Sequence, residues 1–287
     1  MRRDEICIRD PYVVLLGDVY YMYGTDGYLT FSGKPARGFP LYTSQDLENW
    51  EGPQFPFLAS DHFWGKTDFW APEMHQYRGS YYLFASFIAP GRMRGTQILK
   101  ADRPEGPFLP ISQGPATPSD WMCLDGTLVL DQNGAPYLVF CHEWVQVGDG
   151  EICVLPLSEN LSASVGEPRL LFRASEAPWV KAYDTGKYVT DGPFAYRTQD
   201  GQLLLLWSSF SEGGYTIGCA RSANGSIAGP WTQDCRPLYA DDGGHGMVFR
   251  KKDGSLCLTV HSPNDSTKER PIFLPVVEED GSLRVVK

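Results

Sequence analysis

The sequence predicts an all-β protein, a five-bladed β-propeller, from three observations. Apolar segments of strand length come in pairs, and no helical periodicity longer than two turns is visible. The pairs begin 53 to 66 residues apart, a spacing that suits one four-stranded blade each. Each pair is joined by a short turn that contains glycine, at Gly17-Asp18, Arg78-Gly79, Asn133-Gly134, Asp200-Gly201 and Asp253-Gly254. Such turns between β-rich segments indicate hairpins.

Each unit extends beyond its hairpin. The units open with "RDPYVV" at Arg9, "WAPEMH" at Trp70, "LDGTLV" at Leu124, "TDGPFA" at Thr190 and "GGHGMV" at Gly243. The equivalent leading positions are predicted as 10, 72, 125, 191 and 245. Four hairpins are followed by a third strand, often with Gly-Pro after it, and the fifth is followed by "PIFLPVVEEDGSLRVV". The repeats fill the chain, so we expect one domain, residues 1–287, without an appended binding module.

Charge and composition narrow the classes of partner. The formal net charge is −10 and the acidic residues are scattered, whereas nucleic-acid and anionic-membrane surfaces need clustered Lys and Arg. Seven cysteines without a C-x-x-C pair predict neither a disulfide framework nor a structural zinc site. No apolar leader segment is visible, so we expect a cytoplasmic protein. The sequence does not indicate an oligomeric state.

Three acidic residues stand at or beside the start of repeated units. In a propeller the innermost strand of each blade lines the central channel, so residues at the starts of these strands meet at one mouth. We therefore expect Asp10, Asp125 and Asp191 to lie close together, although more than a hundred residues separate the outer two. The alternative for any one of them is that it only forms a turn next to Gly or Pro.

Three carboxylates around one cavity suit a metal cage, a two-metal hydrolase or the hydrolysis of glycosides. The histidines form no H-E-x-x-H pair and no G-x-S-x-G motif is present, which disfavours zinc and nucleophilic-serine chemistry. Glycosidases need one protonated carboxyl group and one ionised carboxylate on opposite faces of the sugar. Acids on different blades face each other across a gap, which favours the separation of roughly 6.5–9.5 Å found in inverting enzymes.

At these residues the sequence resembles glycoside hydrolase family 43, the five-bladed inverting arabinofuranosidases, xylosidases and endo-arabinanases, over the whole chain. The opening Arg-Asp-Pro of the family matches residues 9–11, which implies Asp10 as the general base. Asp125 matches the aspartate that orients the acid and tunes its pKa. His245 matches a histidine that lines the channel in many members, often near a bound calcium or sodium. We expect it to be a channel residue first and a metal ligand second, with no cofactor required.

The sequence departs from the family at the general acid. The family usually has a glutamate before Gly-Pro, and this chain has Asp191 there. The shorter side chain withdraws the carboxyl group by about 1.5 Å, and an error of one ångström can cost on the order of a hundredfold in rate. Either the backbone lies further inward, or another acid donates the proton. The alternatives are Glu143 in "CHEW" and Glu176 in "RASEAPWV".

Aromatic residues beside these segments are the candidates for sugar binding, because the apolar face of a pentose packs on an aromatic ring. They are Trp70, Trp144 and Trp179. Glu73 of the Trp-Ala-Pro-Glu stretch completes the substrate-binding set, although an acid here more often anchors the start of a strand.

These features predict an inverting glycoside hydrolase that releases a pentose from plant-derived oligosaccharides. α-L-Arabinofuranosides are the first substrate expected and β-D-xylosides the second, with endo-arabinanase action third. The alternative is a propeller without an effective acid that only binds carbohydrate. Neither nucleic acid nor a membrane is expected as a partner.

Overall fold

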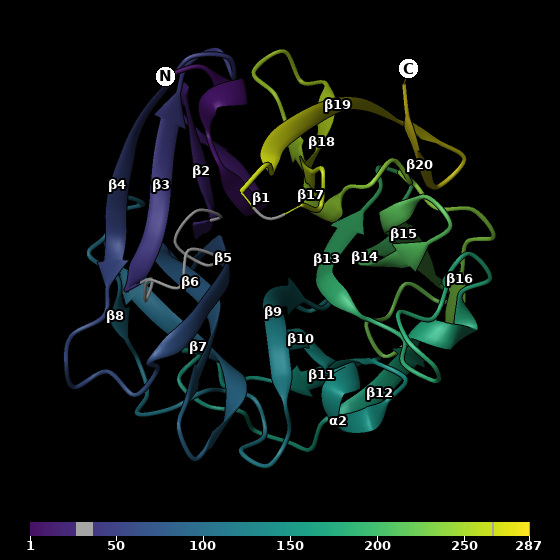
Figure 1. The fold of residues 1–287 in the computed structure, drawn as a ribbon, viewed down its shortest axis with the longest axis horizontal. Coiled ribbons are helices and arrows are strands. Elements are labelled where there is room, and N and C mark those ends of the chain that lie inside the picture. Colours follow the sequence, from purple (N-terminus) through teal and green to yellow (C-terminus); the bar gives the residue numbers. More distant parts are fainter. Residues whose placement is uncertain (27–36, 266, 287) are drawn as a thin grey trace.

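The computed structural model describes residues 1–26, 37–265 and 267–286, which form five four-stranded antiparallel sheets around a common centre (Figure 1). Each sheet consists of four strands that are consecutive in the chain. The predicted five-bladed β-propeller is confirmed. The described residues contain only three short helical turns: η1 (Arg3–Glu5), α2 (Trp144–Val147) and η2 (Ala174–Glu176).

The blades are numbered in chain order, and the first strand of each is the innermost (Figure 1). Blade one has β1 (Ile8–Leu16), β2 (Val19–Asp26), β3 (Gly38–Ser44) and β4 (Trp50–Leu58). Blade two has β5 (Thr67–Tyr77), β6 (Ser80–Ala89), β7 (Arg92–Ala101) and β8 (Leu109–Pro110). Blade three has β9 (Cys123–Leu130), β10 (Pro136–His142), β11 (Glu151–Pro156) and β12 (Arg169–Arg173). Blade four has β13 (Asp191–Arg197), β14 (Leu203–Ser211), β15 (Gly214–Ser222) and β16 (Trp231–Gln233). Blade five has β17 (Gly244–Arg250), β18 (Leu256–Ser262), β19 (Arg270–Glu279) and β20 (Ser282–Val285).

The predicted hairpin turns lie between the first and second strands of the blades. One glycine in each has a positive φ, and a Cβ added there would meet no atom within 4 Å. The backbone conformation, rather than lack of space, therefore favours glycine at these turns. The five glycines are Gly17, Gly79, Gly134, Gly201 and Gly254.

A second backbone feature repeats at the mouth of the channel. One residue near the start of each innermost strand has φ between 45° and 55°, and the hairpin register shifts beside it. These residues are Asp10, Ala71, Asp125, Gly192 and His245. The predicted equivalent positions 72 and 191 are each wrong by one residue, because the left-handed residues of blades two and four are Ala71 and Gly192. The left-handed backbone, which Pro cannot adopt, sets the true repeat.

The N–H group of each left-handed residue donates a hydrogen bond to a side chain of the preceding blade. Hydroxyl groups accept three of them, from Ala71 to Thr25 (2.7 Å), from Asp125 to Ser86 (2.8 Å) and from His245 to Ser208 (2.8 Å). Nδ1 of His261 accepts the bond of Asp10 (3.2 Å), and the Asp125 carboxylate accepts that of Gly192 (3.0 Å). These bonds link all five blades around the mouth and hold the strained residues in place.

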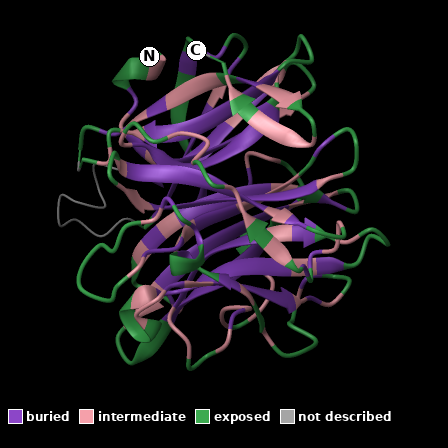
Figure 2. Ribbon diagram, turned by 90° about the vertical axis from the view of Figure 1, so that its right-hand side faces the viewer, coloured by how far each residue is buried: buried purple, intermediate pink, exposed green. Residues whose placement is uncertain are grey.

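The core lies between the blades, where the strands are mostly buried while the connecting loops are exposed (Figure 2). Phenylalanines fill the space between blades one and two; the ring centres of Phe39 in β3 and Phe87 in β6 lie 5.7 Å apart. Among the described residues no strand pairs blade five with blade one. A backbone bond from the Ile8 N–H to the Glu269 carbonyl (3.4 Å) and side-chain contacts join these blades instead. Arg9 bonds the buried Glu269 there at 2.9 Å. The described cysteines form no disulfide.

Candidate active site

Asp10 is buried at the start of β1 and has several partners that stabilise its charged form. The Thr25 hydroxyl donates a hydrogen bond to Oδ2 (2.6 Å), and Nδ1 of His245 lies 3.2 Å from Oδ1. Burial alone would raise the pKa of Asp10, but the charges of His245 and Arg9 and the bond from Thr25 hold it below its ordinary value. Asp10 is therefore an ionised carboxylate at neutral pH, as a general base must be.

The two histidines beside Asp10 have opposite protonation states. Burial lowers the pKa of His261 to about 3, so its ring is neutral and Nδ1 can accept the Asp10 N–H bond. Burial also disfavours the charged form of His245, but Asp10, Asp125 and Asp191 raise its pKa. The charged form of His245 is thus favoured among three carboxyl groups, with Nδ1 3.2 Å from Asp10 and 3.7 Å from Asp125.

Asp125 and Asp191 form a second, more protonated group across the mouth. Burial and the negative charges of Asp191 and Asp10 raise the pKa of Asp125 to about 8, although His245 opposes the shift. Burial and the charge of Asp10 also raise the pKa of Asp191, against His245 and a hydrogen bond from Tyr215. Two carboxyl groups with raised pKa values at one mouth titrate as a pair and do not both ionise at neutral pH. The three predicted acids therefore divide into one ionised group and one pair that holds a proton.

The backbone that carries Asp191 lies tightly against the channel. A Cβ on Gly192 would stand 2.6 Å from Cδ2 of His245, so only glycine fits between the strand and the imidazole. Gly192 also has a positive φ of 51°, which glycine adopts without strain. Its N–H donates to Oδ2 of Asp125 (3.0 Å). These contacts hold the start of β13 close to the other acids.

Glu143 lies in a separate, buried ion cluster at the same mouth. It forms a short hydrogen bond with Nη1 of Arg94, while Nη2 of Arg94 bonds Asp68 at 2.7 Å. The guanidinium of Arg94 lies 4.4 Å from the centre of the Trp70 ring. The pKa of Glu143 is raised, by burial and by the charges of Asp191 and Asp68, although Arg94 opposes the shift. Arg94 therefore holds Glu143 as a paired side chain and fixes the orientation of Trp70.

We expect Arg94→Met to destabilise the fold by about 3–5 kcal/mol, because it leaves Glu143 buried without its partner. Chemical denaturation of both proteins measures the difference in unfolding free energy. The exposed pair of Arg78 and Glu159 (2.8 Å) provides the matched control, because Arg78→Met should cost no more than about 1 kcal/mol. Equal losses for the two variants would contradict this account of Arg94.

Two other residues predicted for the site, Glu176 and Trp179, have structural contacts instead. Glu176 is exposed in η2, where its carboxylate accepts the N–H bond of Arg173 (2.8 Å). Trp179 packs in the blade-four core, with its ring centre 5.0 Å from that of Trp207. These contacts give Glu176 a capping role and Trp179 a packing role.

Trp144 and Glu73 also have defined contacts. Trp144 is half-buried in α2 and packs on Tyr183 with ring centres 5.5 Å apart. Glu73 is buried with its carboxylate 3.2 Å from Nε2 of His75. This contact fits the alternative that Glu73 anchors the start of its strand. Sequence reasoning missed His261 and Tyr215, which contact the acids directly from second and third strands.

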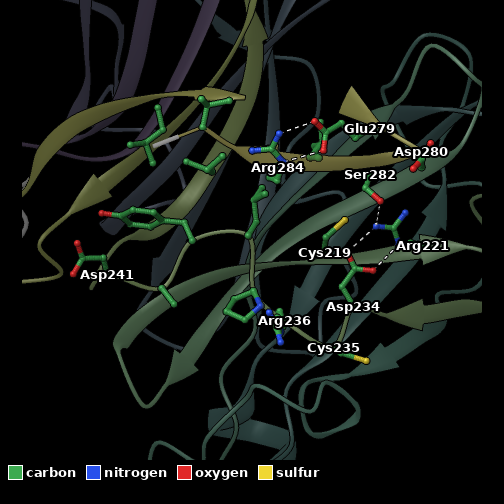
Figure 3. A pocket seen from close by; sticks show the side chains of 18 residues that line it. Cys219, Arg221, Asp234, Cys235, Arg236, Asp241, Glu279, Asp280, Ser282 and Arg284 are labelled. Atoms are coloured by element: carbon green, nitrogen blue, oxygen red, sulfur yellow. Dashed lines mark hydrogen bonds and ion pairs between the residues drawn. The ribbon is translucent and has the colours of Figure 1, made fainter. Parts of the chain in front are cut away.

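A groove of about 940 Å³ lies away from these acids, at the outer edge of blades four and five. Its lining includes Arg221, which bonds Asp234 and Ser282, and Arg284, which bonds Glu279 (Figure 3). None of the candidate residues lines it. The chemistry of the acids is therefore separate from this groove.

A comparison with known families gives a match over most of the chain. The family model described as "Glycosyl hydrolases family 43" matches residues 6–278. The chain belongs to this family. Family 43 membership confirms the predicted glycoside hydrolase and implies an oligosaccharide substrate.

Two solved structures resemble the chain over nearly its whole length. The endo-arabinase from Bacteroides thetaiotaomicron VPI-5482 is 42% identical with a TM-score of 0.91, and the match covers 98% of each chain. A thermostable family-43 glycoside hydrolase is 26% identical with a TM-score of 0.84, and the match covers 97% of this chain and 92% of the other.

A curated relative from Cellvibrio japonicus (strain Ueda107) is described as an extracellular exo-alpha-(1->5)-L-arabinofuranosidase. It is 22% identical over 220 residues, which span 70% of this chain and 58% of the relative's length. The prediction of a cytoplasmic enzyme is wrong on this finding, because the relative is described as extracellular. No helix among the described residues is long and apolar enough to cross a membrane.

The metal-ligand role expected for His245 stays a prediction, and the described side chains around it can be compared with what a metal cage needs. Among the described residues, no group of three or more His, Cys, Asp or Glu side chains could hold a metal ion. Nδ1 of His245 faces Asp10 and Asp125, so this histidine offers at most Nε2. The described side chains do not fit a metal cage, and no step of the reaction below passes through a metal.

Proposed function

We propose that the protein is an inverting glycosidase that cleaves α-L-arabinofuranosyl linkages in arabino-oligosaccharides. The observation that carries this proposal is the meeting of the three acids at one mouth: Nδ1 of His245 lies 3.2 Å from Asp10 and 3.7 Å from Asp125, and Asp125 accepts the N–H bond of the residue after Asp191. Their surroundings lower the pKa of Asp10 and raise the pKa values of Asp125 and Asp191. An inverting glycosidase needs these two protonation states at one mouth. The arabinofuranosyl specificity is supported by the relatives described as an endo-arabinase and an exo-arabinofuranosidase.

In the proposed reaction, the carboxylate of Asp10 accepts a proton from a water molecule as the water oxygen attacks the anomeric carbon. The glycosidic bond breaks, and its electron pair stays on the leaving oxygen. Asp191 donates its proton to that oxygen, so that no alkoxide is released. Burial and the negative charge of Asp10 keep the pKa of Asp191 raised, and Asp125 titrates together with it. A later exchange with solvent returns both groups to their starting states.

Proton NMR of the enzyme with unactivated arabino- and xylo-oligosaccharides tests this proposal. We expect sugar release from the arabino series, with the β-anomer of arabinose or of the shorter oligosaccharide formed first. Release of the shortest product only would indicate exo action, whereas a range of chain lengths would indicate endo action. A first-formed α-anomer would exclude inversion. Binding without release of any sugar would favour the alternative of a carbohydrate-binding propeller.

The pH dependence of kcat/KM on an unactivated oligosaccharide should have one alkaline limb. Asp10 has a lowered pKa, so it stays ionised throughout the range above about pH 4. The proton shared by Asp125 and Asp191 is lost as the pH rises through about 8, the raised pKa of Asp125. The rate should therefore fall above that pH. An alkaline limb near pH 5 would contradict the assignment of a raised pKa to this pair.

A further inference from the structure

Tyr215 contacts the proposed general acid directly, although no sequence motif marks it. Its phenol donates a hydrogen bond of 2.9 Å to Oδ2 of Asp191. Tyr215 belongs to β15, the third strand of blade four, and Asp191 begins β13, so β14 lies between the two strands. The long side chain of Tyr215 reaches past this strand to the mouth of the channel.

The surroundings of Tyr215 leave its ring little freedom. The ring stacks on His261 with an interplanar angle of 23° and a centroid distance of 5.4 Å. A Cβ on Gly244 would stand 2.8 Å from Cδ1 and Cε1 of Tyr215, so the ring rests on the backbone there. The backbone is held as well, because its N–H donates to Asp242 (3.2 Å) and its carbonyl accepts from Gly243 (2.8 Å). The phenol oxygen is therefore fixed in space.

The phenol also keeps its proton. Burial raises the pKa of Tyr215 well above its ordinary value, and the negative charges of Asp191 and Asp10 raise it further. The Tyr215 hydroxyl is consequently a permanent donor toward Asp191 at any pH of an activity measurement.

A protonated carboxyl group has one carbonyl oxygen, which accepts hydrogen bonds, and one hydroxyl oxygen, which donates. Because Tyr215 always donates to Oδ2, it favours Oδ2 as the carbonyl oxygen and Oδ1 as the oxygen that carries the proton. We propose that Tyr215 is a positioning residue that directs the proton of Asp191 to Oδ1 and stabilises the carboxylate left after transfer. This inference rests on the proposed function of Asp191 as general acid.

The same hydrogen bond becomes stronger as the reaction proceeds. In the ground state it joins a phenol to a neutral carboxyl group, and in the transition state Asp191 gains negative charge. Hydrogen bonds to charged groups are stronger than those to neutral groups, and interactions that strengthen in the transition state raise kcat. A short aspartate gains most from such support, since it cannot adjust its reach as a glutamate can.

Tyr215→Phe tests the inference, because it removes the hydroxyl and keeps the ring stack on His261. On an unactivated arabino-oligosaccharide we expect kcat to fall about 10- to 100-fold, the effect of losing a hydrogen bond to a charged group. KM should change little. On an aryl arabinofuranoside with a good leaving group, which needs little proton donation, we expect less than about a threefold loss.

Tyr196→Phe is the matched control, because Tyr196 is in the same blade and its hydroxyl forms a short bond with a different carboxylate, that of Glu278. It should leave both rates unchanged. An equal loss on both substrates for Tyr215→Phe would mean a structural role only, and no loss on either would also overturn the inference. If the wild-type protein cleaves neither substrate, the proposed function fails, and the inference about Tyr215 fails with it. Loss of activity in Tyr215→Phe alone, with an active wild-type protein, concerns only the inference.

Discussion

Asp10→Asn should lower kcat on arabino-oligosaccharides by about 10²- to 10⁴-fold. The amide cannot accept the proton of the attacking water, so the nucleophile stays weak. The fold should persist, because Asn can still accept from His245 and Thr25 can turn its hydroxyl to accept from the new NH₂ group. Affinity measured by titration calorimetry should stay the same or tighten, since the change affects the transition state rather than substrate binding.

A small anion distinguishes the loss of the base from general damage at the site. Azide does not need to be deprotonated, so it should restore part of the turnover of Asp10→Asn and yield a glycosyl azide of inverted configuration. The control is Asp18→Asn, which changes an exposed aspartate in the turn at the other end of β1 and should leave the rate unchanged. Full activity of Asp10→Asn would exclude Asp10 as the base.

Much of the fold was predictable because its signals are local. A glycine with positive φ stands at each of the five predicted hairpin turns, and turn chemistry of this kind depends on the residues of the turn themselves. The meeting of Asp10, Asp125 and Asp191 at one mouth followed from the repeat, because topology alone brings the innermost strands together.

The errors in the predicted repeat have non-local causes. Ala71 adopts a left-handed conformation because its N–H bonds Thr25 of the preceding blade, and nothing in "WAPE" indicates this. Gly192 takes the equivalent place in blade four because His245, far along the chain, leaves no room for a side chain. Contacts between blades therefore determine which residue of each opening motif adopts the left-handed conformation.

Several side chains that support the site could not be assigned from the sequence. Thr25, Ser86, Ser208 and His261 all stand near the polar ends of second strands, a pattern that was visible in the sequence without a function. Arg94 lies within a strand and has no motif, although its two ion pairs settle the surroundings of Glu143. Such partners become apparent only when the blades are placed side by side.

The second large effect concerns the proton donor. Asp191→Asn should lower kcat on unactivated arabino-oligosaccharides by about 10²- to 10⁴-fold, because the amide has no acidic proton to give to the leaving oxygen. An aryl arabinofuranoside with a good leaving group should lose far less activity. The new amide can still accept the Tyr215 bond, so the site should keep its shape.

Glu143→Gln decides between the two acids at this mouth. Arg94 pairs with Glu143 and Asp68, so a proton on Glu143 would have to be gained against the charge of Arg94, whereas Asp191 has no ion pair with an arginine or lysine among the described residues. We expect Glu143→Gln to lower kcat by less than about tenfold, equally for both kinds of substrate, with some loss of stability because Arg94 loses a charged partner. The opposite pattern, in which only Glu143→Gln discriminates between leaving groups, would make Glu143 the donor. Asp191 would then act on that donor through its charge, which helps to raise the pKa of Glu143.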